Sequence, residues 1–197
     1  DPSLRDEWIV LTAHYDHLGF HEAPAGEDGI WNGADDNASG TAVVLEIARR
    51  LAASGSLRRS VLVLFTSGEE RGLVGSAHYS MHPLVPYGQV VLNINVDMVG
   101  RSVGAVNCIA TGCDEVFDKA VAIGKETGVK VLPDPHPSWR LAYFVDSYHF
   151  ARFDVPFIEF ITEFHSDYHQ PSDEIEKIRF QELGRILEVM FKLTKYY

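Results

Sequence analysis

Basic residues are scarce in this sequence of 197 residues, which has 17 lysines and arginines against 28 aspartates and glutamates. The formal net charge of −11 would repel nucleic acids and anionic membrane surfaces, so we expect neither as a partner. The longest apolar runs have the length of a strand and fall far short of the ~20 residues of a membrane-spanning helix, so we expect no membrane insertion. Cations, or ligands that carry an amine, are the partners that this charge favours.

Cysteine is nearly absent. Cys108 and Cys113 form neither a metal-ligand spacing nor a disulfide framework, although one bridge between them is compatible with the sequence. Internal repeats, low-complexity tracts and linkers long enough to separate domains are also lacking, so we expect a single domain over residues 1–197. A signal peptide is lacking too, but the chain enters an apolar run within about seven residues, which suggests an N-terminus trimmed by processing.

The apolar runs are short, rich in Val and Ile, and not alternating. This pattern is typical of strands that are covered on both faces, and it predicts strands at residues 8–13, 61–66, 90–96 and 155–161. Helical spacing predicts a helix between Ser39, a candidate N-cap, and Gly55. Further helices are expected at residues 114–128 and 180–197, with a short helical stretch at residues 147–153.

Strands that alternate with helices indicate an α/β fold. We expect one domain with a central, mostly parallel mixed β-sheet and helices on both faces. Ligands of such sheets bind beyond the carboxyl ends of the strands. The first three predicted strands run into acidic or imidazole side chains at those ends: His14 and Asp16, Glu69 and Glu70, and Asp97.

Each of these clusters has both a functional and a structural interpretation. His14 and Asp16 alternate and point the same way in an extended segment, so Asp16 is a candidate to accept the second N–H of a metal-bound His14. His-x-Asp alone is a weak signal, and His17 and His21 are interpreted as polar loop residues. Asp97 is harder to explain without a partner, since it ends an apolar strand.

The acidic turns are similarly ambiguous when they are taken one by one. The segment "NGADDNASG" fits helix capping by Asp36, Asn37 or Ser39, or a carboxylate that bridges two cations. Glu69 and Glu70 fit the first turn of a helix, where acids are favourable, or a metal ligand beside a general base.

Taken together, the clusters resemble the zinc-dependent aminopeptidases with two co-catalytic zinc ions, the M28-type metallopeptidases. The similarity covers most of the chain and lies in "VLTAHYDHLG", "NGADDNASGTA", "FTSGEERGLVGS", "NVDMVG" and "DYHQPSDE". It implies a zinc-exopeptidase fold of the phosphorylase/hydrolase-like type. It also implies hydrolysis of the N-terminal bond of a peptide with a free amino terminus, and a secreted or periplasmic location.

The resemblance also implies the metal ligands. His14 and Asp97 match the terminal ligands of one zinc ion, Glu70 and His169 match those of the other, and Asp36 matches the bridging carboxylate. Three carboxylates against two divalent ions leave one positive charge, which a bridging hydroxide would neutralise. Imidazole and carboxylate without thiolate suit zinc, and Mn²⁺ or Co²⁺ are expected substitutes.

Two residues are assigned to catalysis. Glu69 matches the general base that takes a proton as the zinc-bridging hydroxide attacks, and Asp16 is the candidate that orients His14. The resemblance further implies a cis peptide bond between Asp36 and Asn37.

Residues 136–149 and 163–168 are expected to form part of the substrate pocket, since both precede elements that feed the same sheet edge. Tyr148, His149 and His165 are candidates for substrate contact, and Asp146 is ambiguous. The sequence sets neither the preferred amino-terminal residue nor the oligomeric state.

Two alternatives stay open. A glutaminyl cyclase-like acyltransferase would share the fold but use one zinc ion, and the full set of expected ligands favours two. A non-catalytic, receptor-type binding ectodomain would be expected to have lost these ligands, and this sequence keeps them.

Overall fold

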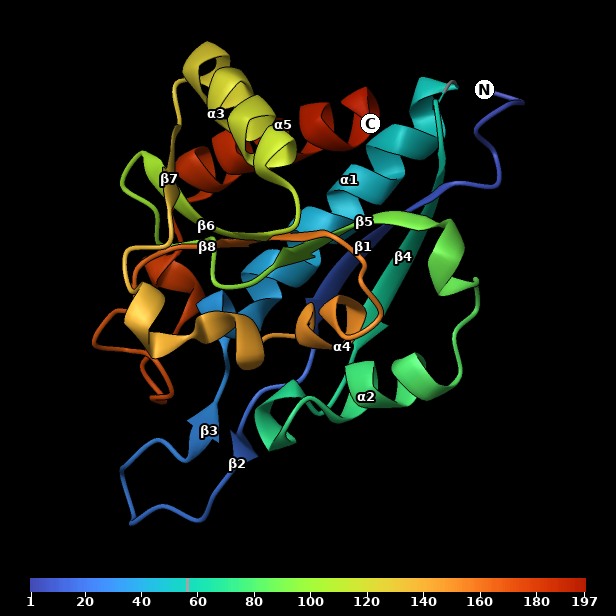
Figure 1. Ribbon diagram of the computed structural model, residues 1–197. Coiled ribbons are helices and arrows are strands. Elements are labelled where there is room, and N and C mark those ends of the chain that lie inside the picture. Colours follow the sequence, from blue (N-terminus) through green and yellow to red (C-terminus); the bar gives the residue numbers. More distant parts are fainter. Residues whose placement is uncertain (56) are drawn as a thin grey trace.

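The centre of the molecule is a six-stranded sheet with the order β4-β1-β5-β8-β6-β7 (Figure 1), seen in a computed structural model that describes residues 1–55 and 57–197. All neighbouring strands in this described part are parallel except β6 and β8, which are antiparallel. The predicted α/β fold with a mostly parallel mixed sheet is confirmed. The strands are β1 (Trp8–His14), β4 (Ser60–Thr66), β5 (Val90–Val96), β6 (Ala105–Thr111), β7 (Lys130–Pro133) and β8 (Phe157–Ile161).

Helices cover both faces of this sheet (Figure 1). One face carries α1 (Gly40–Ser54), α3 (Asp114–Thr127) and α5 (Phe180–Tyr196), and the other carries α2 (Val74–Met81) and α4 (Tyr148–Ala151). None of the described helices combines the length and the apolar character that crossing a membrane requires.

The short elements connect this framework. A two-stranded sheet of β2 (Gly19–Phe20) and β3 (Ile30–Trp31) extends from the carboxyl ends of the main strands (Figure 1). The short helical segments of the described residues are η2 (Glu69–Arg71), η3 (Tyr87–Gln89), η4 (Pro137–Trp139), η5 (Leu141–Tyr143) and η6 (Ile175–Lys177). A further segment, η1 (Ala34–Ser39), is interrupted by non-helical backbone angles at Asp36 and Asn37.

The core has two parts, one on each face of the sheet. The larger part packs Leu11 and Ile94 of the strands against Ile47 of α1 and Met190 of α5. The smaller part contains Val10 and lies under α2 and α4. Because neighbouring residues of β1 enter opposite parts, both faces of this strand are apolar, which explains the lack of alternation in its sequence.

The start of α1 differs from the expectation. Ser39 was a candidate N-cap, but its hydroxyl donates to the carbonyl and the carboxylate of Asp35, at 2.8 and 3.0 Å. The amide oxygen of Asn37 instead accepts from the backbone N–H of Gly40 at 3.0 Å. The predicted end of the helix is confirmed, because Gly55 has the left-handed conformation of a helix C-cap, with φ of 70°.

The two cysteines are not bridged. Cys108 and Cys113 are both buried and carry free thiols. The Sγ of Cys113 donates to the carbonyl oxygen of Phe157 at 2.8 Å. The thiols therefore belong to the core around β6 and β8.

Candidate metal centre

Three neighbouring strands bring their polar ends together. The parallel strands β4, β1 and β5 lie side by side in the sheet, so their carboxyl ends share one edge. His14 is the last residue of β1, Asp97 directly follows β5, and Glu69 and Glu70 begin η2 after β4. The loop 162–174, which follows β8, adds His169 to the same place.

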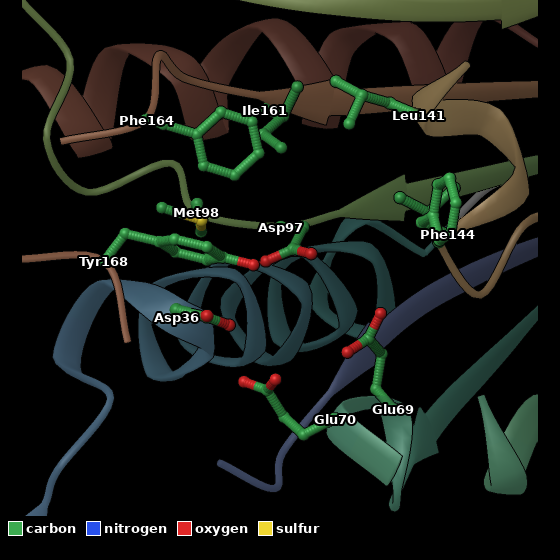
Figure 2. A pocket seen from close by; sticks show the side chains of 11 residues that line it. Asp36, Glu69, Glu70, Asp97, Met98, Leu141, Phe144, Ile161, Phe164 and Tyr168 are labelled. Atoms are coloured by element: carbon green, nitrogen blue, oxygen red, sulfur yellow. The ribbon is translucent and has the colours of Figure 1, made fainter. Parts of the chain in front are cut away.

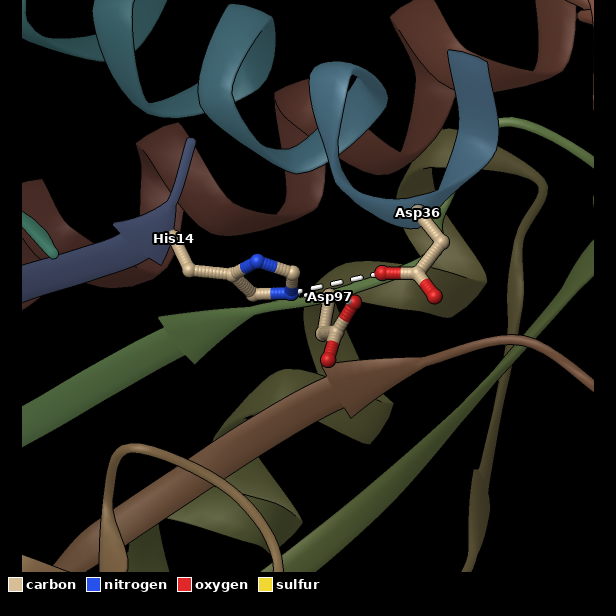
Figure 3. A group of neighbouring side chains, drawn as sticks. All are labelled: His14, Asp36 and Asp97. Carbon is tan, nitrogen blue, oxygen red and sulfur yellow. Dashed lines mark ion pairs between the residues drawn. The ribbon is translucent and has the colours of Figure 1, made fainter. Parts of the chain in front are cut away.

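The first cluster contains His14, Asp36 and Asp97 (Figure 3). The Nε2 atom of His14 lies 3.4 Å from Oδ1 of Asp36 and 3.5 Å from Oδ1 of Asp97. Although all three side chains are buried, Nε2 of His14 and Oδ1 of Asp97 have no hydrogen-bond partner among the described residues. Neighbouring ligands of a tetrahedral zinc ion lie about 3.3 Å apart, given metal–ligand distances near 2.0 Å. This cluster therefore fits a cation.

The second cluster contains His17, Asp36, Glu70 and His169. The Nε2 atom of His169 lies 3.2 Å from Oδ2 of Asp36 and 3.1 Å from Oε2 of Glu70. The Nδ1 atom of His17 lies 2.9 Å from Oε1 of Glu70 and 3.8 Å from Oδ2 of Asp36. Asp36 thus turns Oδ1 to the first cluster and Oδ2 to the second, as a bridging carboxylate requires.

The backbone around Asp36 is fixed from a distant loop. The peptide bond between Asp36 and Asn37 is cis, as the resemblance implies. The buried carboxylate of Asp173 accepts the backbone N–H groups of Asp35 and Asp36 on the same oxygen, at 2.9 and 3.1 Å. The loop that carries His169 therefore also holds the bridging residue in place.

The neighbouring Asp35 points elsewhere. Its carboxylate accepts from the backbone N–H of Gly100 at 2.6 Å and lies 3.0 Å from Nε2 of His165. His165 was a candidate for substrate contact, but the structure pairs it with this buried carboxylate. The Asp35 carboxylate therefore connects η1 to Gly100 and to the loop 162–174.

Asp16 lies beside His14, but its carboxylate makes a different bond from the one predicted. The hydrogen-bond partner of Nδ1 of His14 is the backbone carbonyl of Asp16 at 3.1 Å, while the carboxylate lies 3.6 Å away. That carboxylate accepts the backbone N–H of Glu69 at 3.2 Å. Asp16 therefore connects the His14 ring to the backbone of η2.

Glu69 belongs to neither cluster but lies next to both. Its side chain borders the pocket, and its carboxylate is directed away from that of Glu70 (Figure 2). Burial, together with the charge of Asp97, raises the pKa of Glu69 to about 9. When no cation is near, Glu69 therefore keeps its proton at neutral pH.

The electric field of the centre favours positive charge. Burial raises the pKa of Asp97 to about 6. Burial alone would lower the pKa of His14, but the charge of Asp97 and the neighbouring carboxylates of Asp16 and Asp36 raise it well above its usual range. Carboxylates that stabilise a charged imidazole in this way would also stabilise a metal ion.

A pocket of about 80 Å³ opens beside the clusters (Figure 2). Asp36, Glu69, Glu70 and Asp97 form its acidic side. Its apolar side consists of Met98, Leu141, Phe144, Val145, Ile161, Phe164 and Tyr168. Both segments predicted as pocket wall, 136–149 and 163–168, contribute to this side.

The other substrate-contact candidates lie off this pocket. Tyr148 and His149 belong to α4 and pack against each other, with ring centroids 5.3 Å apart. Asp146 is buried and accepts a hydrogen bond from the hydroxyl of Thr66 at 2.5 Å. Asp146 therefore connects the segment before α4 to the end of β4.

The structure therefore brings together all five predicted ligands, His14, Asp36, Glu70, Asp97 and His169, and adds His17. From the sequence, His17 is expected to be a polar loop residue and not a ligand. The one available signal was the repeat of imidazole in "AHYDH", directly after a buried strand.

Comparison with known proteins gives a consistent result. The model of a family described as Peptidase family M28 matches residues 1–194. Aminopeptidase YwaD of Bacillus subtilis is 31% identical over 194 residues, covering 91% of this chain and 39% of that protein. The chain thus spans about two fifths of the length of this curated relative.

Solved structures show the same fold. A zinc aminopeptidase from Bacillus subtilis, BSAP, superposes with a TM-score of 0.77 at 26% identity, over 95% of this chain and 45% of that one. A glutaminyl cyclase from Bacteroides thetaiotaomicron superposes with a TM-score of 0.76 at 20% identity, over 98% of this chain and 74% of that one. At this identity the second likeness concerns the fold alone.

Proposed function

Because the chain belongs to peptidase family M28, we propose that it is a metallo-aminopeptidase, which hydrolyses the N-terminal peptide bond of peptides with a free amino terminus. The observation that carries the proposal is the position of Asp36. One of its oxygens faces the first cluster and the other faces the second, with the pocket and Glu69 alongside.

The residues present fit two divalent ions. The first would be held by His14, Asp36 and Asp97, and the second by Asp36, Glu70 and His169. Buried imidazole and carboxylate atoms that lack hydrogen-bond partners within the described chain support this, and the ligand types suit Zn²⁺, with Mn²⁺ or Co²⁺ as substitutes. Bound ions of this kind polarise the scissile carbonyl and lower the pKa of the attacking water.

Glu69 moves the proton in this proposal. Its carboxylate accepts a proton from the attacking water and delivers it to the leaving amine. General acid–base catalysis of this type contributes about 10²–10⁴-fold to the rate. Asp16 is a positioning residue, since its carboxylate holds the backbone N–H of Glu69 and its carbonyl accepts from the His14 ring.

The pocket explains how a peptide end would be bound. Its acidic side would hold the ions, so a free amino terminus bound in the pocket would lie beside the metal centre. Its apolar side, which includes Leu141, Phe144 and Phe164, can bind the first side chain. We therefore infer a preference for peptides that begin with an apolar residue.

Hydrolysis of a panel of aminoacyl-arylamides, before and after treatment with a strong zinc chelator, tests the proposal. We expect apolar aminoacyl groups to be released fastest, N-acetylated versions to be inert, and the chelated protein to be inactive until zinc is added back. Hydrolysis that continues unchanged after chelation would contradict the proposal. Cyclisation of N-terminal glutaminyl peptides without any hydrolysis would favour the single-zinc cyclase instead.

A further inference from the structure

His17 is buried in a way that its position in a loop does not explain. Its side chain is 7% exposed. Both ring nitrogens are buried, and neither has a hydrogen-bond partner in the described part of the chain. Burying a polar ring without partners is costly, and buried polar atoms usually have a partner of some kind.

The His17 ring lies close to two carboxylates of the second cluster. Its Nδ1 lies 2.9 Å from Oε1 of Glu70, and that oxygen also lacks a hydrogen-bond partner within the described residues. The two atoms are therefore close without forming a hydrogen bond, which is the arrangement of two ligands that share one ion. Ligand atoms of His17, Asp36 and Glu70 all lie within 4.8 Å of one another.

The chain also provides space for this ring. Gly33 has φ of 62°, and a Cβ atom there would lie 2.5 Å from Cγ and 2.8 Å from Cβ of His17. A larger residue at this position would displace the imidazole. The ring also meets that of His169 edge-on, with centroids 5.7 Å apart, so the two imidazoles approach the same carboxylates from different sides.

We propose that His17 is a further ligand of the metal ion in the second cluster, in addition to His169. This rests on the proposed two-metal function. The second cluster then supplies four protein ligands, whereas the first supplies three. We therefore expect the ion of the second cluster to be the last that a chelator removes.

Zinc titration of the metal-free protein tests the assignment, with a chromophoric chelator as competitor. Substitution His17→Gln keeps a polar side chain but removes the imidazole ligand. We expect it to weaken the binding of one of two zinc ions by at least about 10–100-fold and to leave the other unchanged, since even residues that only orient a ligand contribute this much. His21→Gln is the matched control, because His21 lies directly after β2, on the other side of this strand from His17, and packs against Trp31.

X-ray absorption of the zinc-loaded protein provides a direct readout. A fit to the wild-type spectrum should need three imidazole ligands for the two zinc ions, those of His14, His17 and His169. A fit to the spectrum of the His17→Gln variant should need two. In a His17→Cys variant loaded with Co²⁺, the new thiolate should give a sulfur-to-cobalt charge-transfer band. If His17→Gln does not fold, the His17→Cys variant still tests whether residue 17 binds the metal ion.

The outcomes separate this assignment from the proposed function. If the wild type binds two zinc ions and His17→Gln binds both as tightly with the same imidazole count, or if the His17→Cys variant gives no charge-transfer band, the assignment is wrong and the two-metal function stands. If the wild type binds fewer than two ions, the two-metal function fails and the assignment fails with it.

Discussion

Glu69 and Glu70 follow each other in η2, yet their carboxylates lie in different surroundings. The Glu70 carboxylate lies between the rings of His17 and His169, at 2.9 and 3.1 Å from their nitrogens. The Glu69 carboxylate borders the pocket and is held through its backbone by Asp16. In the proposed function, this difference between two adjacent residues makes Glu70 a metal ligand and Glu69 the proton carrier.

The substitution Glu69→Gln tests this separation. We expect kcat to fall by at least about 10²–10⁴-fold, because the amide cannot accept the proton. The metal content should stay unchanged, since Glu69 belongs to neither cluster. Steady-state kinetics and elemental analysis of the same preparation provide both values, with the exposed Glu27→Gln as control. A variant that loses its metal together with its activity would make Glu69 a ligand instead.

The sequence supported the ligand set mainly through the resemblance, because each ligand alone had an ordinary structural interpretation. His17 could not be predicted in this way. Its ring is directed by Gly33 and His169, which are distant in the sequence, and a loop has no periodicity that would indicate the direction. The same holds for Asp16, whose carboxylate is the predicted partner of His14, whereas in the structure its backbone carbonyl has that role.

Among the elements, the buried strands were the easiest to predict. β1, β4, β5 and β8 are mostly apolar without strict alternation because both of their faces are covered. β6 and β7 were missed, since Asn107 follows only two apolar residues in β6 and β7 has four residues at the sheet edge. The short helix α2 was missed as well, because eight residues show too little periodicity.

The ends and interiors of helices respond differently to the loss of glycine. Gly55 ends α1 with φ of 70°, and Gly55→Ala should destabilise the fold by about 1 kcal/mol because alanine is strained there. Gly184 lies in the exposed interior of α5 with no atom near an added Cβ. Gly184→Ala should stabilise by about 0.5–1 kcal/mol.

Urea denaturation of the metal-free protein measures both effects. The two variants differ from the wild type by the same methyl group, so each serves as the control for the other. If Gly55→Ala and Gly184→Ala shifted the unfolding midpoint in the same direction, backbone conformation would not be what determines their effects on stability.

For the whole molecule, the acidic centre makes stability depend on pH. The pKa of Glu69 is raised from 4.5 to about 9 and that of Asp97 from 3.8 to about 6, chiefly by burial. In the folded chain these groups keep protons that the unfolded chain has already lost. Folding therefore takes up protons in this range, and the free energy of unfolding falls as the pH rises. The raised pKa of His14 acts in the same direction above its usual value.

We accordingly expect the Tm of the metal-free protein to fall between about pH 5 and pH 9. With zinc the trend should weaken or reverse, because the metal binds deprotonated ligands. Circular dichroism melts across this range, with chelator and with zinc, check both expectations. A Tm of the metal-free protein that rises with pH would contradict the raised pKa values.

The loop after β8 contributes both His169 and Asp173, and Asp173 holds the backbone of Asp35 and Asp36. The centre is consequently incomplete until this late loop has docked on a segment that precedes it by more than a hundred residues. Before this loop has folded, a nascent chain already contains His14, Asp36 and Asp97 but cannot complete the second cluster, which needs His169. We therefore expect a metal ion to enter the second cluster only after residues 162–174 have docked.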